Sequence, residues 1–254
     1  MNQQAKGWWA RTARMSRWWA SACAACGQWP SLPHGDRLCH ACETLLAPAT
    51  PRCPRCALAL SEPEACCKAC TSPPGPWSLT ACAAAVEYSE PWRGWIHRFK
   101  HHGEPEWARL FARVLLEQPT VQRLLDQSSV WLPIPMTPSA LGSRGYNPAW
   151  ELTRCLAKGF PGQTPTIAPD WLIKPHDTTP QHTLLRSERL TNLRHAFATT
   201  PAASNRIRGL DVVLIDDVMT TGATLESAAT ALLQNGAARV YAVVLARTPK
   251  PAAA

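Results

Sequence analysis

Two acidic residues and three threonines gather in one short stretch of the sequence, VVLIDDVMTTGAT at 212–224. Asp216 and Asp217 follow four apolar residues that predict a buried strand, and the threonines surround Gly222 ahead of the next helix. Carboxylates accept hydrogen bonds from sugar hydroxyls, whereas free N–H groups and hydroxyls at a helix start bind phosphate. The stretch therefore predicts a site for a ribose phosphate. The alternative is structural, with the acids capping the helix and the threonines forming an ordinary turn.

Eight of the eleven cysteines form four pairs, each with two intervening residues. This spacing lets one tight turn present two thiolates to a metal ion, and two such turns complete a zinc site with sulfur ligands at about 2.3 Å. We expect two successive zinc ribbons. Because this cysteine-rich segment has few aliphatic residues to bury, metal binding must supply much of its folding free energy, so the metal should be structural and not catalytic. The predicted ligands are Cys23, Cys26, Cys39 and Cys42 for the first site and Cys53, Cys56, Cys67 and Cys70 for the second.

Several alternatives stay open for this cysteine-rich segment. The pairs could combine in crossed order, or they could be redox dithiols or disulfides, although an unexported chain disfavours disulfides. Cys66 is an alternative ligand to Cys67, and His34 or His40 could replace a nearby cysteine.

The elements that must position the acids are strands alternating with helices, which predicts an α/β fold with a mainly parallel, doubly wound sheet. In such sheets the ligand lies beyond the carboxyl ends of the strands, where we expect the two acids. The helix expected at 224–235 carries a core-facing apolar stripe from Leu225 to Leu233. The predicted strands are 79–88, 130–134, 170–173, 212–215 and 240–246, and the predicted helices are 91–100, 104–118, 147–160, 187–194 and 224–235.

We expect three parts along the 254 residues: a basic, tryptophan-rich leader at 1–20, a double zinc ribbon at 21–76 and the α/β domain at 77–250. The formal net charge of +8 favours an anionic partner such as a phosphate or a nucleic acid. The N-terminus lacks the apolar core of a secretory signal, and no stretch approaches the ~20 apolar residues of a membrane span. We therefore expect a cytoplasmic protein without a transmembrane segment.

The stretch at 212–224 resembles the phosphoribosyl pyrophosphate signature of type I phosphoribosyltransferases. It is accompanied, in order, by the cysteine pairs, FKHHGE, PIPMTPSALGSRGYNPAWELTRCLA and TPQHTLLRSERLTNLRHAF. Together these features resemble the ComF family of double-zinc-ribbon phosphoribosyltransferase-like proteins (ComFC and GntX relatives), from Cys23 to Thr248. The resemblance implies a type I phosphoribosyltransferase-like sheet flanked by helices and preceded by the ribbons.

The resemblance also implies roles for particular residues. Asp216 and Asp217 would hold the ribose hydroxyls, the turn that follows would hold the 5′-phosphate, and Arg144 would join the two acids as catalytic residues. The loop from Thr137 to Arg144 would bind pyrophosphate, while Pro148 stands where the family commonly has glutamine. The implied binding residues are Lys100, Thr137, Arg144, Asp216, Asp217, Thr220, Thr221, Gly222, Ala223 and Thr224, and those of a flexible loop are Gln181, Arg186, Arg189 and Asn192.

For function, the resemblance implies binding of phosphoribosyl pyrophosphate with Mg²⁺ and a part in natural transformation, DNA uptake or DNA utilisation. The implied partners are single-stranded DNA and competence helicase or recombination proteins. Whether the chain transfers phosphoribosyl groups stays open, because no motif supplies a general base for an acceptor. The alternative is a single-stranded nucleic-acid-binding or protein-docking factor in which the ribosyl phosphate site is a non-catalytic sensor.

Overall fold

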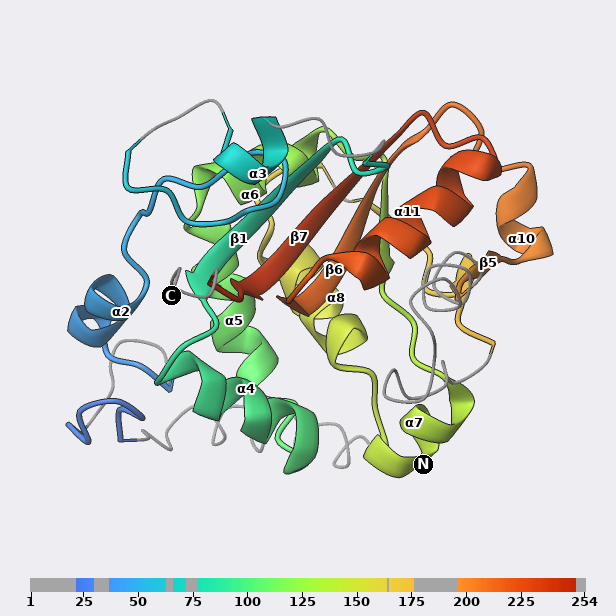
Figure 1. The fold of residues 1–254 in the computed structure, drawn as a ribbon. Coiled ribbons are helices and arrows are strands. Elements are labelled where there is room, and N and C mark those ends of the chain that lie inside the picture. Colours follow the sequence, from blue (N-terminus) through green and yellow to red (C-terminus); the bar gives the residue numbers. More distant parts are fainter. Residues whose placement is uncertain are drawn as a thin grey trace, which may run out of the picture. The chain divides into compact units, whose positions relative to one another are not determined.

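The computed structural model describes residues 22–29, 37–62, 66–71, 77–163, 165–175 and 196–249 (Figure 1). The chain divides into two compact units, residues 1–48 and residues 49–254. Four features expected from the sequence lie outside the described residues: the leader at 1–20, the alternative ligand His34, the residues of the flexible loop and the helix at 187–194. In the described parts of the chain, no helix combines the length and the apolar character needed to cross a membrane.

The smaller unit holds the first two cysteine pairs. Cys23 and Cys26 lie in a tight turn, closed by a 2.9 Å hydrogen bond from the N–H of Gly27 to the carbonyl of Cys23. Gly27 adopts a φ of 72°, a left-handed conformation that favours glycine. The second pair lies at the start of α2 (His40–Leu46), with Cys39 as its N-cap. The described part of this unit therefore brings two cysteine pairs together at a turn and at the start of a helix.

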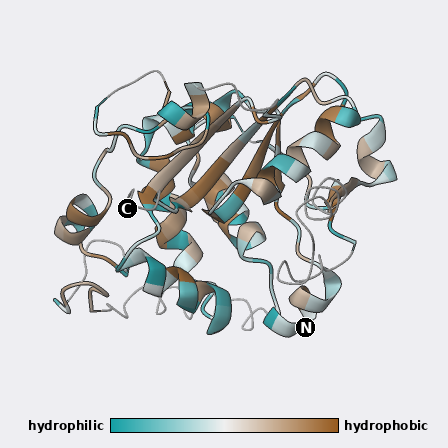
Figure 2. Ribbon diagram, in the orientation of Figure 1, coloured by the Kyte–Doolittle hydropathy of each residue, from teal (hydrophilic) through white to brown (hydrophobic). Residues whose placement is uncertain are grey.

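The larger unit is organised by a five-stranded sheet of order β1-β7-β6-β2-β3, in which all neighbouring strands are parallel. Its central strands are buried on both faces, as parallel sheets covered by helices usually are. Figure 2 shows hydrophobic residues concentrated along these strands. The strands are β1 (Ala81–Glu87), β2 (Val130–Pro133), β3 (Thr166–Ile167), β6 (Asp211–Met219) and β7 (Arg239–Arg247). The predicted parallel α/β sheet is confirmed.

Helices cover both faces of this sheet, with α11 on one face and α5, α6 and α8 on the other (Figure 1). The predicted stripe of α11 is confirmed from Leu225 to Leu232, which are buried, while Leu233 is only partly buried. The helices among the described residues of this unit are α3 (Lys68–Thr71), α4 (Trp92–His101), α5 (Trp107–Leu116), α6 (Pro119–Asp126), α7 (Pro138–Arg144), α8 (Pro148–Gly159), α10 (Pro201–Ser204) and α11 (Ala223–Gln234).

Two predicted elements differ from the structure. The strand expected at 170–173 becomes β4 (Leu172–Ile173), which pairs antiparallel with β5 (Ala198–Thr199) in a separate two-stranded sheet. The strand expected at 212–215 continues to Met219, because its parallel register with β7 extends past the acids. The acids therefore lie within the last part of the strand rather than after it.

A third difference concerns the segment that was expected to be a pyrophosphate loop. Residues 138–144 form the helix α7 instead of a loop. The hydroxyl of Thr137 caps the helix by accepting a hydrogen bond from the N–H of Ala140, and Pro138 occupies the first turn. Both features favour the start of a helix at this position. The prediction of a loop over these residues was wrong.

The division into compact units places the second cysteine cluster in the larger unit, residues 49–254, whereas the sequence grouped both clusters in one predicted double ribbon at 21–76. Ala57 is fully buried and packs in the same core cluster as Leu79 of the α/β unit. The N–H of Cys82 in β1 donates to the carbonyl of Pro54 at 2.8 Å. These contacts join the segment directly to the edge strand of the sheet.

Candidate functional site

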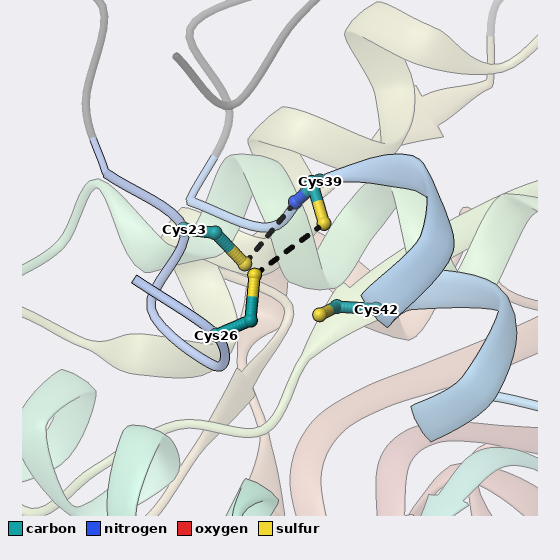
Figure 3. Close-up of side chains that lie close together, drawn as sticks. All are labelled: Cys23, Cys26, Cys39 and Cys42. Carbon is teal, nitrogen blue, oxygen red and sulfur yellow. Dashed lines mark hydrogen bonds between the residues drawn. The ribbon is translucent and has the colours of Figure 1, made fainter. Parts of the chain in front are cut away.

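The first cysteine cluster brings together four sulfur atoms from a turn and from α2 (Figure 3). All four lie within 4.8 Å of one another, and the Sγ atoms of Cys26 and Cys39 are 3.9 Å apart. The N–H of Cys39 donates to Cys23 Sγ at 3.4 Å. The members are the predicted ones, Cys23, Cys26, Cys39 and Cys42.

The second cluster repeats this arrangement in the larger unit. The Sγ atoms of Cys56 and Cys67 are 3.6 Å apart, and the N–H of Cys67 donates to Cys53 Sγ at 3.4 Å. Its members are Cys53, Cys56, Cys67 and Cys70. Neighbouring pairs therefore combine sequentially, as predicted. Cys67 and not Cys66 belongs to the cluster, and among the described residues His40 belongs to neither cluster.

Both clusters fit a structural zinc ion in geometry. Four sulfurs bound tetrahedrally at about 2.3 Å lie about 3.8 Å apart, close to the separations in both clusters. Burial by itself would raise the pKa of Cys53, but hydrogen bonds from the backbone of Cys67, Cys56 and Arg55 outweigh it and lower that pKa to about 6. The same balance lowers the pKa of Cys23 to about 6. A low pKa favours the thiolate, which is the form that binds metal. Without metal, each of these thiols lies beside one whose pKa is raised: a hydrogen bond with Cys39 raises that of Cys42 to about 12, and burial raises that of Cys56 to about 11.

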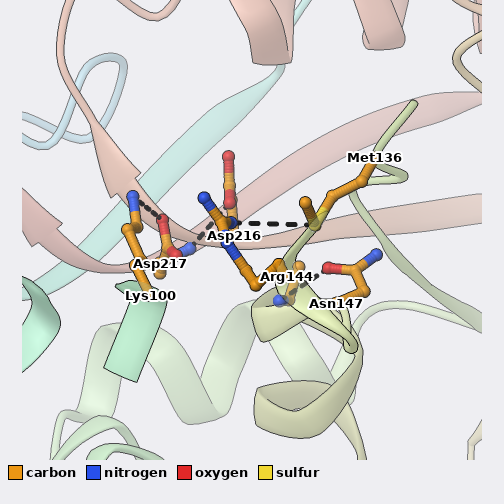
Figure 4. Close-up of polar contacts among 7 residues, drawn as sticks. Lys100, Met136, Arg144, Asn147, Asp216 and Asp217 are labelled. Atoms are coloured by element: carbon orange, nitrogen blue, oxygen red, sulfur yellow. Dashed lines mark hydrogen bonds and ion pairs between the residues drawn. The ribbon is translucent and has the colours of Figure 1, made fainter. Parts of the chain in front are cut away.

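The acid pair of β6 consists of two carboxylates in different surroundings (Figure 4). Asp217 is only 4% exposed, and its Oδ1 lies 2.7 Å from Nζ of Lys100, which comes from the last turn of α4. Asp216 is half-buried, and its Oδ1 accepts the N–H of Asp217 at 2.8 Å. One carboxylate is therefore already paired with a cation, while the other is more open.

The electrostatics of this site distinguish the two acids further. Burial, followed by the negative charge of Asp217, raises the pKa of Asp216 to about 7, and Lys100 opposes that rise. Burial would lower the pKa of Lys100, but the charges of Asp217 and Asp216 outweigh it, so that pKa is raised. Near neutral pH, Asp216 is poised between its two forms. A bound cation or hydroxyl donors would favour its ionised form.

The turn from Thr220 to Thr224 links β6 to α11. Gly222 is the N-cap of α11 and has a φ of 86°, which side chains rarely adopt. A Cβ atom there would lie 2.6 Å from Met219 Cε and 2.9 Å from Trp77 Cη2. The first turn of a helix has free N–H groups and the positive end of the helix dipole, and the threonines at 220, 221 and 224 are exposed. The turn therefore suits an anion.

The segment between β2 and α8 contributes a cation and two helix caps. Thr137 is buried as the cap of α7, so its hydroxyl already has a role in the fold. Arg144 ends α7, and its Nη1 donates to Met136 Sδ at 3.7 Å. Asn147 caps α8 by accepting the N–H of Ala149 at 2.9 Å and donates to the carbonyl of Ile134 at 3.0 Å. These caps hold the segment beside the acids.

Two cavities lie along this segment. The smaller, about 290 Å³, is polar and lined by Lys100, His101, Gly103, Ala140, Ser143 and Arg144. It brings the two predicted cations, Lys100 and Arg144, to one place, and Figure 4 shows both near the acids. The larger cavity, about 710 Å³, has a mainly apolar lining that includes Tyr146, Trp150 and Ile173. The segment therefore borders room both for an anionic group and for an apolar one.

The residues expected in a flexible loop, Gln181, Arg186, Arg189 and Asn192, lie outside the described residues. Sequence reasoning missed Arg247, the last residue of β7, which is 8% exposed. Its Nε donates to the carbonyl of Cys56 at 2.8 Å, and its Nη1 donates to the carbonyls of Met219, at 3.0 Å, and Thr220. The available signal was an arginine that directly follows a buried apolar run.

Comparisons with known proteins find one matching family and several similar proteins. The family described as "Phosphoribosyl transferase domain" matches residues 174–253, which include β6, the turn and α11. The "DNA utilization protein YhgH" of Salmonella typhi is 31% identical over 220 residues, covering 83% of this chain and 90% of that protein. The "Competence protein ComFC" of Bacillus subtilis strain 168 is 29% identical over 220 residues, covering 84% and 85%. The "Competence protein F" of Haemophilus influenzae is 27% identical over 215 residues, covering 83% and 90%.

Proposed function

Because the chain belongs to the ComF family of phosphoribosyltransferase-fold proteins with a double zinc ribbon, we propose that it binds phosphoribosyl pyrophosphate with Mg²⁺ and acts in DNA uptake or utilisation. The names of its relatives, which refer to DNA utilization and to competence, support the role in DNA metabolism. One observation supports the ligand: an acid pair, a lysine and an exposed threonine turn meet at the carboxyl end of β6.

In this proposal each group has a task set by its chemistry. Asp216 and Asp217 accept hydrogen bonds from the ribose hydroxyls, and Asp217 can do so while paired with Lys100 because a carboxylate has about four acceptor positions. The turn from Thr220 to Thr224 holds the 5′-phosphate at the start of α11. Arg144 and Lys100, which line the polar cavity, face the pyrophosphate. Magnesium, bound mainly by substrate oxygens and water, would neutralise part of the pyrophosphate charge.

If transfer occurs, pyrophosphate leaves the anomeric carbon while positive charge develops on the sugar ring. The protein then contributes by positioning the sugar through the acids and by stabilising the departing charge through Arg144. Pyrophosphate release in the presence of candidate nucleobases or DNA distinguishes an enzyme from a sensor. Release that depends on an acceptor supports transfer, and binding without release supports a sensor.

Binding itself is tested by the thermal midpoint of unfolding. A ligand at 100 times its Kd stabilises the folded state by ~2.7 kcal/mol, which raises the midpoint of a chain of this size by roughly 5–10 °C. We expect this rise with phosphoribosyl pyrophosphate and Mg²⁺, and its loss when Asp216→Asn and Asp217→Asn are combined. Asp170→Asn, at an exposed acid away from the pair, should keep it. A full rise in the double variant would contradict the proposal.

A second candidate function, binding of single-stranded nucleic acid in the cytoplasm, is favoured by the net charge of +8 and by the relatives' names. Lysines and arginines that neutralise phosphates make such binding fall steeply with salt. Affinity for an oligonucleotide should therefore drop as salt rises and should persist in the double Asn variant. Loss of DNA binding in that variant would instead point to one shared site. Helicase or recombination proteins of the competence machinery are the protein partners to test next.

A further inference from the structure

Arg247 lies between the second cysteine cluster and the turn that leads to α11. Its guanidinium donates from Nε to the carbonyl of Cys56, a predicted zinc ligand, at 2.8 Å. From Nη1 it donates to the carbonyls of Met219, at 3.0 Å, and of Thr220, which opens the turn. A planar guanidinium presents its donors in a rigid fork, so these contacts hold the two segments at a fixed separation.

The carbonyls that Arg247 holds determine where the turn's N–H groups point. In a trans peptide the C=O of one residue and the N–H of the next point in opposite directions. Fixing the carbonyls of Met219 and Thr220 toward Arg247 therefore directs the N–H groups of Thr220 and Thr221 away from it, toward the open side of the turn. Backbone N–H groups arranged in this way are the donors with which such turns bind phosphate.

The Cys56 carbonyl, at the other end of this bridge, is part of a segment whose position depends on its cysteines. The turn of Cys53 and Cys56 contacts β1 through Pro54, whose carbonyl accepts the N–H of Cys82 at 2.8 Å. Arg52 adds a second link, because its Nη2 donates to the carbonyl of Ala85 in β1 at 3.3 Å while its Nη1 donates to the carbonyl of Ala57 at 3.2 Å. Ala57 is fully buried in the core with a φ of 56°, a conformation costly for a residue with a side chain. Zinc bound at the four sulfurs would add a further constraint on the conformation of this short, loop-rich segment.

We propose that Arg247 couples zinc in the second cluster to ribosyl phosphate binding at the turn from Thr220 to Thr224. Arg247 is a positioning residue in this scheme, because it acts through the turn and not on the ligand. The proposal rests on the function proposed above. Since coupling between two binding sites is reciprocal, zinc strengthens ligand binding and the ligand strengthens zinc binding by the same factor.

The two clusters provide a matched pair of single-zinc proteins for the test. Cys26→Ser with Cys42→Ser removes the first site, which belongs to the other compact unit, and Cys56→Ser with Cys70→Ser removes the second. Zinc content per chain and the Kd for phosphoribosyl pyrophosphate with Mg²⁺ are measured for each by metal analysis and calorimetry. We expect an unchanged Kd without the first site and a Kd weakened about tenfold without the second, within the usual range of coupling.

A second variant keeps the test independent of how well the cluster variants fold. Arg247→Lys retains the charge but not the fork, so it should keep both zinc ions and weaken ligand binding about tenfold. Arg239→Lys, at the exposed end of the same strand, is the control and should bind like wild type. In the protein that carries only the second zinc, the ligand should slow zinc release to a chelator several-fold, and Arg247→Lys should abolish that protection.

The outcomes separate this inference from the function on which it rests. No binding to the wild-type protein would overturn both. Normal wild-type binding with equal Kd values in the two single-zinc proteins, or ligand protection that Arg247→Lys leaves intact, would overturn the coupling alone. If Arg247 had a purely structural role, Arg247→Lys would lower the thermal midpoint but would leave the ligand's effect on zinc release unchanged.

Discussion

Replacing Asp216 by asparagine tests the electrostatics of the acid pair without any ligand. Burial and the neighbouring charge of Asp217 raise the pKa of Asp216 from its ordinary value of 3.8 to about 7. A carboxyl group with a raised pKa stabilises the fold while it is protonated and loses that contribution as it ionises. Its contribution is thus complete below pH 3.8 and disappears as the pH rises through 7. Asparagine has no such dependence.

The size of the effect follows from these pKa values. Between pH 5.5 and pH 8 the unfolded carboxyl stays ionised, while the folded one goes from mostly protonated to mostly ionised. That is about 1.5 pH units of linked proton release at ~1.4 kcal/mol per unit, or about 2 kcal/mol of unfolding free energy. In a chain of this length the thermal midpoint should move by about 4–8 °C. Wild type should lose this stability relative to Asp216→Asn as the pH rises.

The assay is the thermal midpoint by circular dichroism for zinc-loaded wild type, Asp216→Asn and the exposed control Asp170→Asn at several pH values in this range. The pH dependence of the cysteine clusters is common to the three proteins and cancels in their differences. We expect the wild-type midpoint to fall relative to Asp216→Asn but not relative to Asp170→Asn. A constant difference between wild type and Asp216→Asn, or one of the opposite sign, would refute the raised pKa.

Three further predictions concern the turn, the ion pair and the clusters. Gly222→Ala should lower the unfolding free energy by at least about 1–2 kcal/mol, because a residue with a side chain is strained in a left-handed backbone and its Cβ would crowd Trp77. An unchanged thermal midpoint of unfolding would argue against the turn geometry. Lys100→Met should cost about 3–5 kcal/mol in chemical unfolding because it leaves the Asp217 carboxylate buried and unpaired, and Lys100→Arg should cost much less; equal losses would argue against the ion pair. Chelation should release two zinc ions and make the eight cluster thiols reactive to a thiol reagent. An equal number of reactive thiols with and without the chelator would argue against metal at these sites.

Local signals explain what could be predicted from the sequence. The two members of each cysteine pair are close in sequence, in a tight turn or at the start of a helix, so their spacing alone predicted the members of both clusters. The helices α4, α5, α8 and α11 carry apolar residues at helical spacing, and Gly222 precedes the last of them. The acids, the threonines and Lys100 meet because β6 and α4 place them at one edge of the sheet.

What could not be predicted depends on contacts between distant segments. Two charged residues indicate the end of a strand, yet β6 continues through Asp216 and Asp217 because β7 keeps pairing with it. The second cluster joins the larger unit through bonds from Arg52 and Cys82, and Arg247 reaches Cys56 across 191 positions of sequence. Contacts between residues so far apart in the sequence cannot be predicted from local sequence patterns.

The central claim, a ribosyl phosphate held at the carboxyl end of β6, is tested most directly by a crystal structure with phosphoribosyl pyrophosphate and Mg²⁺. We expect the ribose hydroxyls against Asp216 and Asp217 and the 5′-phosphate within the turn from Thr220 to Thr224, with Arg144 toward the pyrophosphate. Electron density for the ligand elsewhere, with this turn empty at saturating ligand, would contradict the claim.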